Sequence, residues 1–312
     1  MRGWRLLGTV VVLLNLMLLA LYKWLPHLPR ETLWLRRVHR SEGVFLAATA
    51  RFLFSAGEDR QLVCLRAQGG EVLWRIPLPD LPTTSPTYSQ GRLFLPLKGP
   101  RVLCLRAADG APLWSASLKG EATQPVVAKG DRVYVVASQE GWLQALEVKE
   151  GKVLWEQPFP PPLLFPLLFE GERLLLRHRQ RVFVVEAASG KVLQEIPCPE
   201  WLGPPPVVAE GMAFACQEGA LMAFRFPQGT KVWEKALEGT LTRPTYADGR
   251  LFVASKEGRL FIVDAATGET QREMAFPALP LVGVPWAEED GVYLASAKGH
   301  VLAVGLEPGR GP

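Results

Sequence analysis

The sequence has few residues of the kinds that build metal and redox sites. Its four cysteines and four histidines form neither a CxxC pair nor an i, i+4 pair, and they are Cys64, Cys104, Cys198, Cys216, His27, His39, His178 and His300. Structural zinc sites and dithiol redox pairs need such spacings. We therefore expect no metal centre built from these side chains.

Dense runs of lysine and arginine are also missing. The chain has 35 Lys and Arg against 31 Asp and Glu, a formal net charge of +4 over 312 residues. A nucleic-acid-binding face needs clustered cations. This charge pattern excludes nucleic acid as the expected partner.

Glycine and proline, in contrast, are abundant, with 29 and 27 residues, and hydrophobic residues make up 48% of the chain. Their regular placement favours many short strands joined by tight turns rather than helices or disorder. The chain can bury a large core, but at this length a single core usually divides. A chain of repeated units can bury a large apolar surface without forming one very large core.

The amino terminus contains one long apolar run, from Leu6 to Tyr22, preceded by Arg2 and Arg5. Its length is at the short end for a membrane-spanning helix. We predict a signal-anchor or transmembrane helix over residues 1–24, followed by a short linker over residues 25–30. The alternative is a cleaved signal peptide, but Leu18 stands where a cut after Ala20 needs a small residue.

The positive-inside rule does not decide the orientation of this segment, because cations follow it as well as precede it. A short basic start, an apolar run and a folded remainder are typical of exported proteins. We therefore expect a membrane-anchored chain whose folded part is extracytoplasmic, in the periplasm or cell envelope.

The rest of the chain repeats with a period of about 40 residues, as propeller blades do. One series of positions carries Trp74, Trp114, Trp155 and Trp233, with Gln194 and Arg272 in two further copies. A second series pairs a proline with a glycine a few residues later, at Pro86, Pro125, Pro166, Pro206, Pro244 and Pro285, and at Gly91, Gly130, Gly171, Gly211, Gly249 and Gly291. Each unit is interpreted as four short strands that begin at the proline.

The third strand of the unit recurs seven times, from QLVCLRA to HVLAVGL, and the last copy has no outer strand after it. Trp34 lies one period before Trp74, so strand 31–38 supplies the missing strand. We predict an all-β, seven-bladed β-propeller of four-stranded antiparallel blades over residues 31–312, closed by this strand pairing with the carboxyl-terminal blade. An open solenoid is the alternative, but a polar capping repeat is missing at both ends. The tryptophans are expected to be structural docking residues: Trp34, Trp74, Trp114, Trp155 and Trp233.

A glycine followed four residues later by tryptophan, after a strand such as LFIVDAATG, resembles the tryptophan-docking repeat of the PQQ-like quinoprotein propellers. The resemblance covers nearly everything after residue 30. That family includes quinone-dependent dehydrogenases and the BamB-type lipoproteins that help to assemble outer-membrane proteins. The BamB type has eight blades and a lipidated cysteine, whereas we expect seven blades and a helix here.

Resemblance to the dehydrogenases implies adjacent cysteines and a calcium site with amide ligands, but this sequence has no adjacent cysteines and no asparagine except Asn15. We therefore expect no cofactor and no catalytic residues. The resemblance favours a non-catalytic protein-binding scaffold, possibly one used in outer-membrane or envelope protein assembly. The alternatives are a PQQ-dependent oxidoreductase-like protein and an extracytoplasmic ligand sensor.

A partner site is expected on the propeller face that collects the turns after the second and fourth strands. We predict this face to be proline-rich, apolar and basic, and the opposite face to be acidic. Trp142 is the leading candidate, since its repeat equivalents are mostly polar. The other candidates are Phe159, Leu163, Phe165, Trp201, Arg177, Arg179 and Arg181. The alternative is that these apolar connections plug the channel mouth.

The cysteines divide into two pairs. Cys64 and Cys104 occupy the same repeat position in neighbouring blades, where the other copies carry small or aliphatic residues, and are expected to be buried thiols. Cys198 and Cys216 lie in consecutive units. They would form a disulfide in an oxidising compartment or remain as separate thiols.

Overall fold

The computed structural model describes residues 28–29, 31–163, 167–197, 206–226, 228–288 and 291–306. The predicted anchor over residues 1–24 lies outside these residues, as do Phe165 and Trp201. No helix of the described part is long and apolar enough to cross a membrane.

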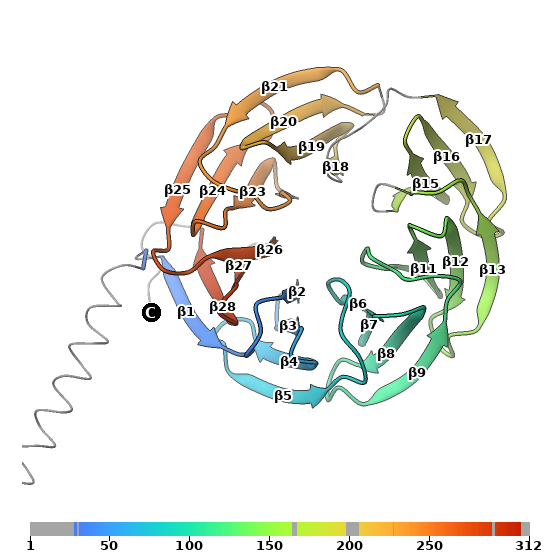
Figure 1. The fold of residues 1–312 in the computed structure, drawn as a ribbon, viewed down its shortest axis with the longest axis horizontal. Helices are drawn as coiled ribbons and strands as arrows, with labels where there is room; N and C mark the ends of the chain where they lie inside the picture. The colour runs from blue at the N-terminus through green and yellow to red at the C-terminus, as the bar shows by residue number, and fades with distance from the viewer. Residues whose placement is uncertain are drawn as a thin grey trace, which may run out of the picture.

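Seven four-stranded antiparallel sheets surround a central axis (Figure 1), so the predicted all-β, seven-bladed propeller is confirmed. Blade 1 comprises β2 (Val44–Ala48), β3 (Phe52–Gly57), β4 (Gln61–Arg66) and β5 (Val72–Pro77). Blade 2 comprises β6 (Thr87–Ser89), β7 (Arg92–Leu97), β8 (Arg101–Arg106) and β9 (Pro112–Ser117). Blade 3 comprises β10 (Val127–Lys129), β11 (Arg132–Ala137), β12 (Trp142–Glu147) and β13 (Val153–Pro158).

Blade 4 comprises β14 (Leu168–Glu170), β15 (Arg173–His178), β16 (Arg181–Glu186) and β17 (Val192–Pro197). Blade 5 comprises β18 (Val207–Ala209), β19 (Met212–Gln217), β20 (Ala220–Arg225) and β21 (Lys231–Ala236). Blade 6 comprises β22 (Thr245–Ala247), β23 (Arg250–Ala254), β24 (Arg259–Asp264) and β25 (Thr270–Ala275). Blade 7 comprises β26 (Leu281–Glu288), β27 (Gly291–Ser296), β28 (His300–Gly305) and β1 (Thr32–Arg37).

The two ends of the described chain meet in blade 7. β1 is antiparallel to β28, with Trp34 opposite Ala303 and Arg37 opposite His300. The blue β1 therefore lies beside the red β28 in Figure 1. The last blade takes its outer strand from the start of the propeller. The backbone of β28 is therefore paired with β1 and does not form an exposed sheet edge.

Burial differs between strands for a simple geometric reason. The second and third strands of each blade are packed between two neighbouring blades, and their central residues are buried continuously, as in β7 and β8. A strand covered on both faces needs an uninterrupted apolar run. The outer strands β5, β9 and β13 instead alternate between exposed and half-buried residues, because one of their faces meets solvent.

Most inner strands begin just after the predicted proline, as β6 does after Pro86 and β18 after Pro206. Proline lacks a backbone N–H and is tolerated at the first position of a strand. Gln90 and Gly91 then both have positive φ, 47° and 75°, the geometry of a type I′ hairpin turn. Blade 7 departs from this pattern, because Pro285 lies inside β26 at a register shift between Val282 and Trp286.

We use the word seam for the boundary between adjacent blades. The tryptophan indoles of the outer strands cross five of the seven seams and donate to a backbone carbonyl of the next blade. The bonds are Trp34 Nε1 to Ala67 O (2.9 Å), Trp74 to Ala107 O (3.1 Å), Trp114 to Val148 O (3.0 Å), Trp155 to Ala187 O (3.1 Å) and Trp233 to Ala265 O (3.1 Å). Each indole thus ties its blade to the next one.

A glycine lies beneath each of these indoles. Gly110, in the turn before β9, has φ of 74°, and a Cβ added there would lie 3.0 Å from the Trp74 ring. Glycine satisfies both demands, since it accepts a left-handed backbone and leaves room for the ring. The spacing of glycine and tryptophan in the sequence therefore has a packing cause.

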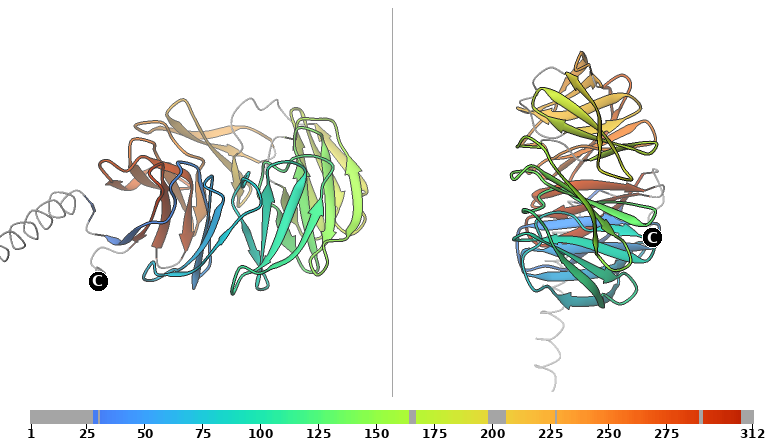
Figure 2. Two further views of the ribbon diagram at one scale, coloured as in Figure 1. Left: turned by 60° about the horizontal axis from the view of Figure 1, so that its bottom comes forward. Right: turned by 90° about the vertical axis from the view of Figure 1, so that its right-hand side faces the viewer.

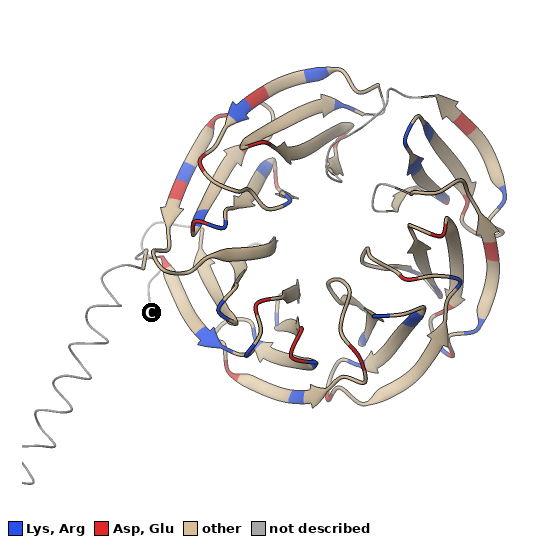
Figure 3. Cartoon of the chain, viewed as in Figure 1, with Lys and Arg blue, Asp and Glu red and all other residues tan. Residues whose placement is uncertain are grey.

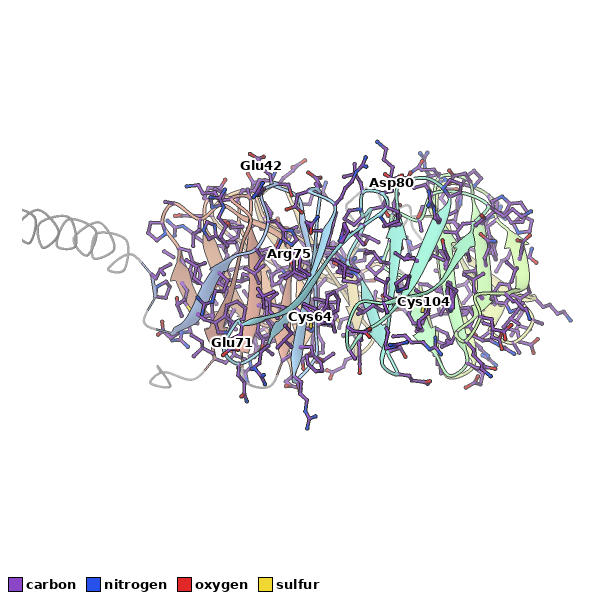
Figure 4. All side chains as sticks on the ribbon, turned by 90° about the horizontal axis from the view of Figure 1, so that it is seen from below. Glu42, Cys64, Glu71, Arg75, Asp80 and Cys104 are labelled. Atoms are coloured by element: carbon purple, nitrogen blue, oxygen red, sulfur yellow. The ribbon has the colours of Figure 1, made fainter. Side chains whose placement is uncertain are left out.

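The propeller has two faces, seen edge-on in Figure 2. We call them the connection face, formed by the blade-to-blade connections and the turns between second and third strands, and the hairpin face, formed by the remaining turns. Figure 4 shows Glu42 and Asp80 at the connection face and Glu71 at the hairpin face, with Cys64 and Cys104 between them. β1 begins at the hairpin face, where Gly305 N–H donates to Glu31 O at 2.8 Å.

Candidate functional site

The predicted separation of charge between the two faces is wrong. The connection face carries carboxylates that the prediction omitted, among them Glu42, Glu58, Asp80, Glu121, Glu140 and Glu257. The hairpin face carries cations that pair with its acids: Arg66 with Glu71, Arg106 with Asp109, Lys129 with Glu172, Arg132 with Asp131 and Lys152 with Glu150. Figure 3 shows both signs distributed around the ring. Each face therefore carries both positive and negative charges.

Two of the predicted apolar contact residues are buried. Phe159 and Leu163 belong to the hydrophobic cluster between blades 3 and 4, and Phe159 lies 5.0 Å from Phe183, ring centre to ring centre. These two side chains pack inward because an exposed position would leave them in water. Arg177 is also buried. Phe159 and Leu163 are therefore packed between blades 3 and 4, which is neither the predicted exposed patch nor the alternative plug of the channel mouth.

Trp142 lies on the connection face and is half-buried. It opens β12 and faces Pro158 of β13 in the strand register. The ammonium of Lys119 lies over its ring, 5.6 Å from the ring centre, within reach of a cation–π attraction. The indole is therefore held in place while part of its surface remains open.

A hydrogen-bond network fixes this arrangement. Gln144 is buried two residues beyond Trp142; its Oε1 accepts the Lys119 N–H at 2.8 Å, and its Nε2 donates to Glu156 Oε1 at 3.0 Å. Glu156 also pairs with the Lys119 ammonium at 3.3 Å. A buried amide whose oxygen and nitrogen both form hydrogen bonds rigidifies its surroundings. The network thus joins the connection between blades 2 and 3, which carries Lys119, to β12 and β13 of blade 3. Trp142 lies beside it in β12.

The remaining described candidates, Arg179 and Arg181, are exposed on the adjacent blade 4. Arg181 forms an ion pair with Glu195 at 2.9 Å. Exposed pairs of this kind contribute little to stability, so both guanidiniums stay available at the surface next to the blade of Trp142.

The central channel holds a separate cavity of about 450 Å³. Tyr88, Tyr246 and Trp286 line it together with Arg243. Arg243 donates through Nη2 to Pro206 O at 3.2 Å, and burial lowers the pKa of its guanidinium. No carboxylate pairs with Arg243 in the part of the chain that the structure describes.

His39, Asp59 and Ser55 form a chain of contacts that resembles a catalytic triad. His39 Nδ1 lies 2.9 Å from Asp59 Oδ1, and its Nε2 lies 2.8 Å from Ser55 Oγ. A nucleophile must reach its substrate, but Ser55 is 0% exposed and His39 is 1% exposed. The group therefore fastens the connection after β1 to blade 1, next to a cavity of about 780 Å³ that also has Arg37, Arg40 and Arg75 in its walls.

The described cysteines are free, buried thiols: Cys64, Cys104 and Cys216. Burial raises the pKa of Cys64 and of Cys216 to about 12, so neither is a reactive thiolate at neutral pH. Cys198 lies outside the described residues, so the pairing of Cys198 with Cys216 stays a prediction. No group of three or more His, Cys, Asp or Glu placed to hold a metal occurs among the residues described.

Sequence reasoning missed the residues that support Trp142. Gln144 had a detectable signal, because its repeat equivalents are all apolar: Val63, Leu103, Phe183, Met222, Phe261 and Leu302. Lys119 and Glu156 had none, since each is an ordinary surface residue until the fold brings it to Gln144. Arg243 was not identified either, because in the sequence it is an ordinary cation before the strand-opening Pro244.

These features define a class: a closed propeller of seven PQQ-like repeats, joined by tryptophans that cross the seams, with a preorganised aromatic on one open face. The chain belongs to the family described as outer membrane protein assembly factor BamB, whose model matches residues 28–96, 80–165 and 217–310.

Individual relatives are distant. The chain is 22% identical over 307 residues to outer membrane protein assembly factor BamB of Yersinia pestis, covering 90% of this chain and 76% of that protein. It is 21% identical to the protein of the same name in Moranella endobia, with 85% of this chain and 62% of the relative covered, so the chain spans less than two thirds of that relative. The crystal structure of BamB from Moraxella catarrhalis superimposes with a TM-score of 0.72 at 15% identity, over 88% of this chain and 97% of that one. At this identity the structural match shows a shared fold.

Proposed function

We propose that this chain is a non-catalytic, membrane-anchored propeller that binds a protein partner in the assembly of outer-membrane proteins. Family membership supports the assembly role. The observation that carries the binding role is the half-buried Trp142, fixed on an open face by Lys119 and Gln144. Binding hot spots are typically aromatic residues that are held in position before the partner arrives.

The proposed contact surface is the part of the connection face around Trp142, with Arg179 and Arg181 at its rim. Its occupant is a protein segment that covers the indole and carries a carboxylate for the arginines. Phe159 and Leu163 contribute by supporting this surface from below, since they pack in the cluster between blades 3 and 4.

The anchor belongs to the same proposal. β1 begins at the hairpin face, and a linker over residues 25–30 spans at most roughly 20 Å. A helix over residues 1–24 would therefore hold the hairpin face near the bilayer and direct the connection face away from it, in the periplasm or envelope. Extraction of membranes at high pH tests the anchor: the full chain should stay with the lipid fraction, and a chain lacking residues 1–24 should be released.

A direct test compares recovery of outer-membrane assembly proteins by two variants of the full chain. Trp142→Ala should lower the recovery of the partner by about tenfold or more, the loss typical of a hot-spot aromatic. Leu154→Ala is the matched control, because Leu154 is 46% exposed on the outer strand of the same blade but far from the proposed surface. Equal recovery by both variants would remove Trp142 from the proposal.

Orientation has its own test. In a Cys198→Ser background, a Trp142→Cys variant in intact membranes should react readily with a polar maleimide, whereas the buried native thiols should not. Protection of position 142 in the absence of any partner would show that this face lies against the bilayer.

A ligand sensor is the second candidate, and the channel cavity with Arg243 favours it. Arg243 lines the cavity with Tyr88, Tyr246, Trp286 and Glu288, and it forms no ion pair within the described part of the chain. A guanidinium in such a cavity suits a small organic anion. Small dicarboxylates should then raise the melting temperature of the wild type and leave Arg243→Met unchanged.

A further inference from the structure

Blade 1 reverses the charge that other blades carry on their outer strands. The residue after the seam-crossing position is a glutamate in four blades, and each of these glutamates pairs with a nearby cation: Glu156 with Lys119, Glu195 with Arg181, Glu234 with Lys231 and Glu273 with Arg259. Arg75 holds the same position in β5 of blade 1. In Figure 4, Arg75 lies on the connection-face side of Cys64. Blade 1 thus has a cation where most other blades have an acid.

A second cation departs from its repeat equivalents at the end of β1. The residues equivalent to Arg37 in the other blades are all uncharged: Pro77, Ser117, Pro158, Pro197, Ala236 and Ala275. Because β1 is the outer strand of blade 7, it ends at the connection to blade 1, which carries Arg40. Arg37, Arg40 and Arg75 therefore gather at the seam between blades 7 and 1.

These three arginines line one cavity of about 780 Å³ on the connection face. Their side chains are exposed, so a ligand can reach them. The other residues of the wall are Val38, His39, Asp59 and Gln61. Val38 and His39 are buried, so the accessible wall is polar and charged. Such a wall suits a small charged ligand rather than an apolar one.

The charge of the arginines is not neutralised by neighbouring acids. Arg75 donates through Nη1 to Val38 O at 2.8 Å, which fixes its guanidinium at the cavity. Within the described part of the chain, none of the three arginines forms an ion pair. Asp59 lies in the wall, but its Oδ1 is 2.9 Å from His39 Nδ1 and its Oδ2 accepts the Arg40 N–H at 2.9 Å. Both of its oxygens are therefore engaged.

We propose that this cavity is a binding site for a soluble phosphate monoester. Three arginines and one aspartate leave two positive charges in excess on its walls. A phosphate monoester carries about −1.5 to −2 charges at neutral pH and three acceptor oxygens, whereas a carboxylate offers one charge and two oxygens. Arginine forks bind such oxygens in pairs. The site lies in blades 7 and 1, away from Trp142 in blade 3, so it goes beyond the proposed function and does not depend on it.

Phosphorus NMR of the full chain in a nonionic detergent at pH 7.5 and low salt tests the site. The probe is methyl phosphate, and malonate, a dicarboxylate of similar charge, competes with it. Methyl phosphate should bind with a dissociation constant of about 1 mM or lower, and malonate about tenfold more weakly or worse. No saturation at about 10 mM methyl phosphate, or equal binding of malonate, would overturn the proposal.

Substitutions of equal charge locate the site. Arg75→Gln should weaken methyl phosphate binding by about tenfold or more. Arg37→Gln should do the same without touching the bond to Val38, so the result does not depend on the stability of blade 1. Arg66→Gln is the matched control, since Arg66 belongs to the same blade but lies at the hairpin face, where it pairs with Glu71. Equal weakening by Arg66→Gln would show only a general effect of net charge and would overturn the site.

A lipid headgroup is the other source of the same chemical group. A short-chain phosphatidic acid should compete with methyl phosphate no more strongly than a soluble monoester does, because the accessible wall has no apolar side chain for an acyl chain. Competition about tenfold stronger would make the ligand a lipid and overturn a soluble one. Trp142→Ala should bind methyl phosphate as the wild type does, and weaker binding would overturn a separate site.

Discussion

At the scale of single residues, the most informative positions are those where one repeat departs from the others. The shared tryptophans and glycines could be predicted from the sequence because the same packing demand recurs at each seam. Phe159 and Leu163 could not be placed, because hydrophobicity alone does not say whether a proline-rich connection turns inward or outward. Trp142 was identifiable as an exception, but its support by Lys119 and Glu156 depends on contacts that only the fold creates.

The docking indoles should act through both hydrogen bonding and packing. Trp114→Phe keeps a ring over Gly151 but loses the bond to Val148 O, and should lower the free energy of unfolding by about 1 kcal/mol. Trp114→Ala also loses the ring and should cost roughly 3 kcal/mol. Denaturant unfolding measures both. Equal losses for the two variants would mean that the hydrogen bond alone, and not the packing, carries the effect.

His39 should make stability depend on pH. Burial is the largest influence and lowers the pKa of His39, against the opposing effect of its hydrogen bond to Asp59. The unfolded chain then binds protons more readily than the folded one below pH of about 6.5. The contribution of His39 to the free energy of unfolding is therefore fully present above that pH. It is lost as the pH falls toward the pKa of His39 in the folded protein, which is the lower of the two.

The measurement is the melting temperature of the wild type and of His39→Gln between pH 7.5 and pH 5.5. The wild type should lose more stability over this range than the variant. Burial, with Arg37 and Lys298 nearby, also lowers the pKa of His300, so a common decline remains in both proteins. Parallel curves would show that His39 does not contribute.

At the scale of strands and turns, most of the architecture could be predicted, since alternation, β-branched residues and the proline–glycine spacing repeat in register. β26 is the exception, because Pro285 falls inside the strand rather than before it. The charge of each face was predicted wrongly for a different reason. The prediction sorted the basic turns without the carboxylates of the connections. It gave a charge difference between the faces that ion pairing within single turns removes.

Two glycines separate backbone strain from packing. Gly91 and Gly110 have nearly the same φ, 75° and 74°, but a Cβ would meet open space at Gly91 and the Trp74 ring at Gly110. Gly91→Ala should cost only the left-handed backbone penalty, roughly 1–2 kcal/mol. Gly110→Ala should cost clearly more by denaturant unfolding. Equal costs would show that the indole moves aside freely.

At the scale of the whole molecule, the blades are not all tied to their neighbours by the same side chain. Trp114 of β9 donates to Val148 O in the next blade, whereas Gln194 holds the equivalent position in β17 and is exposed. Local opening follows low local contact and exposed hydrogen bonds. In hydrogen exchange, the amides of β17 should therefore exchange faster than those of β9, and Gln194→Trp should slow them. Equal exchange in the two strands would contradict a stabilising role for the indoles.

The central claim is that the connection face binds a protein of the outer-membrane assembly machinery through Trp142. Photo-crosslinking in intact cells tests it most directly, with a light-activated amino acid replacing Trp142 in the full chain and, separately, Leu154. The account predicts a discrete crosslinked product with an outer-membrane assembly protein from position 142 and none from position 154. The same products from both positions, or none from position 142 in cells that assemble outer-membrane proteins normally, would contradict it.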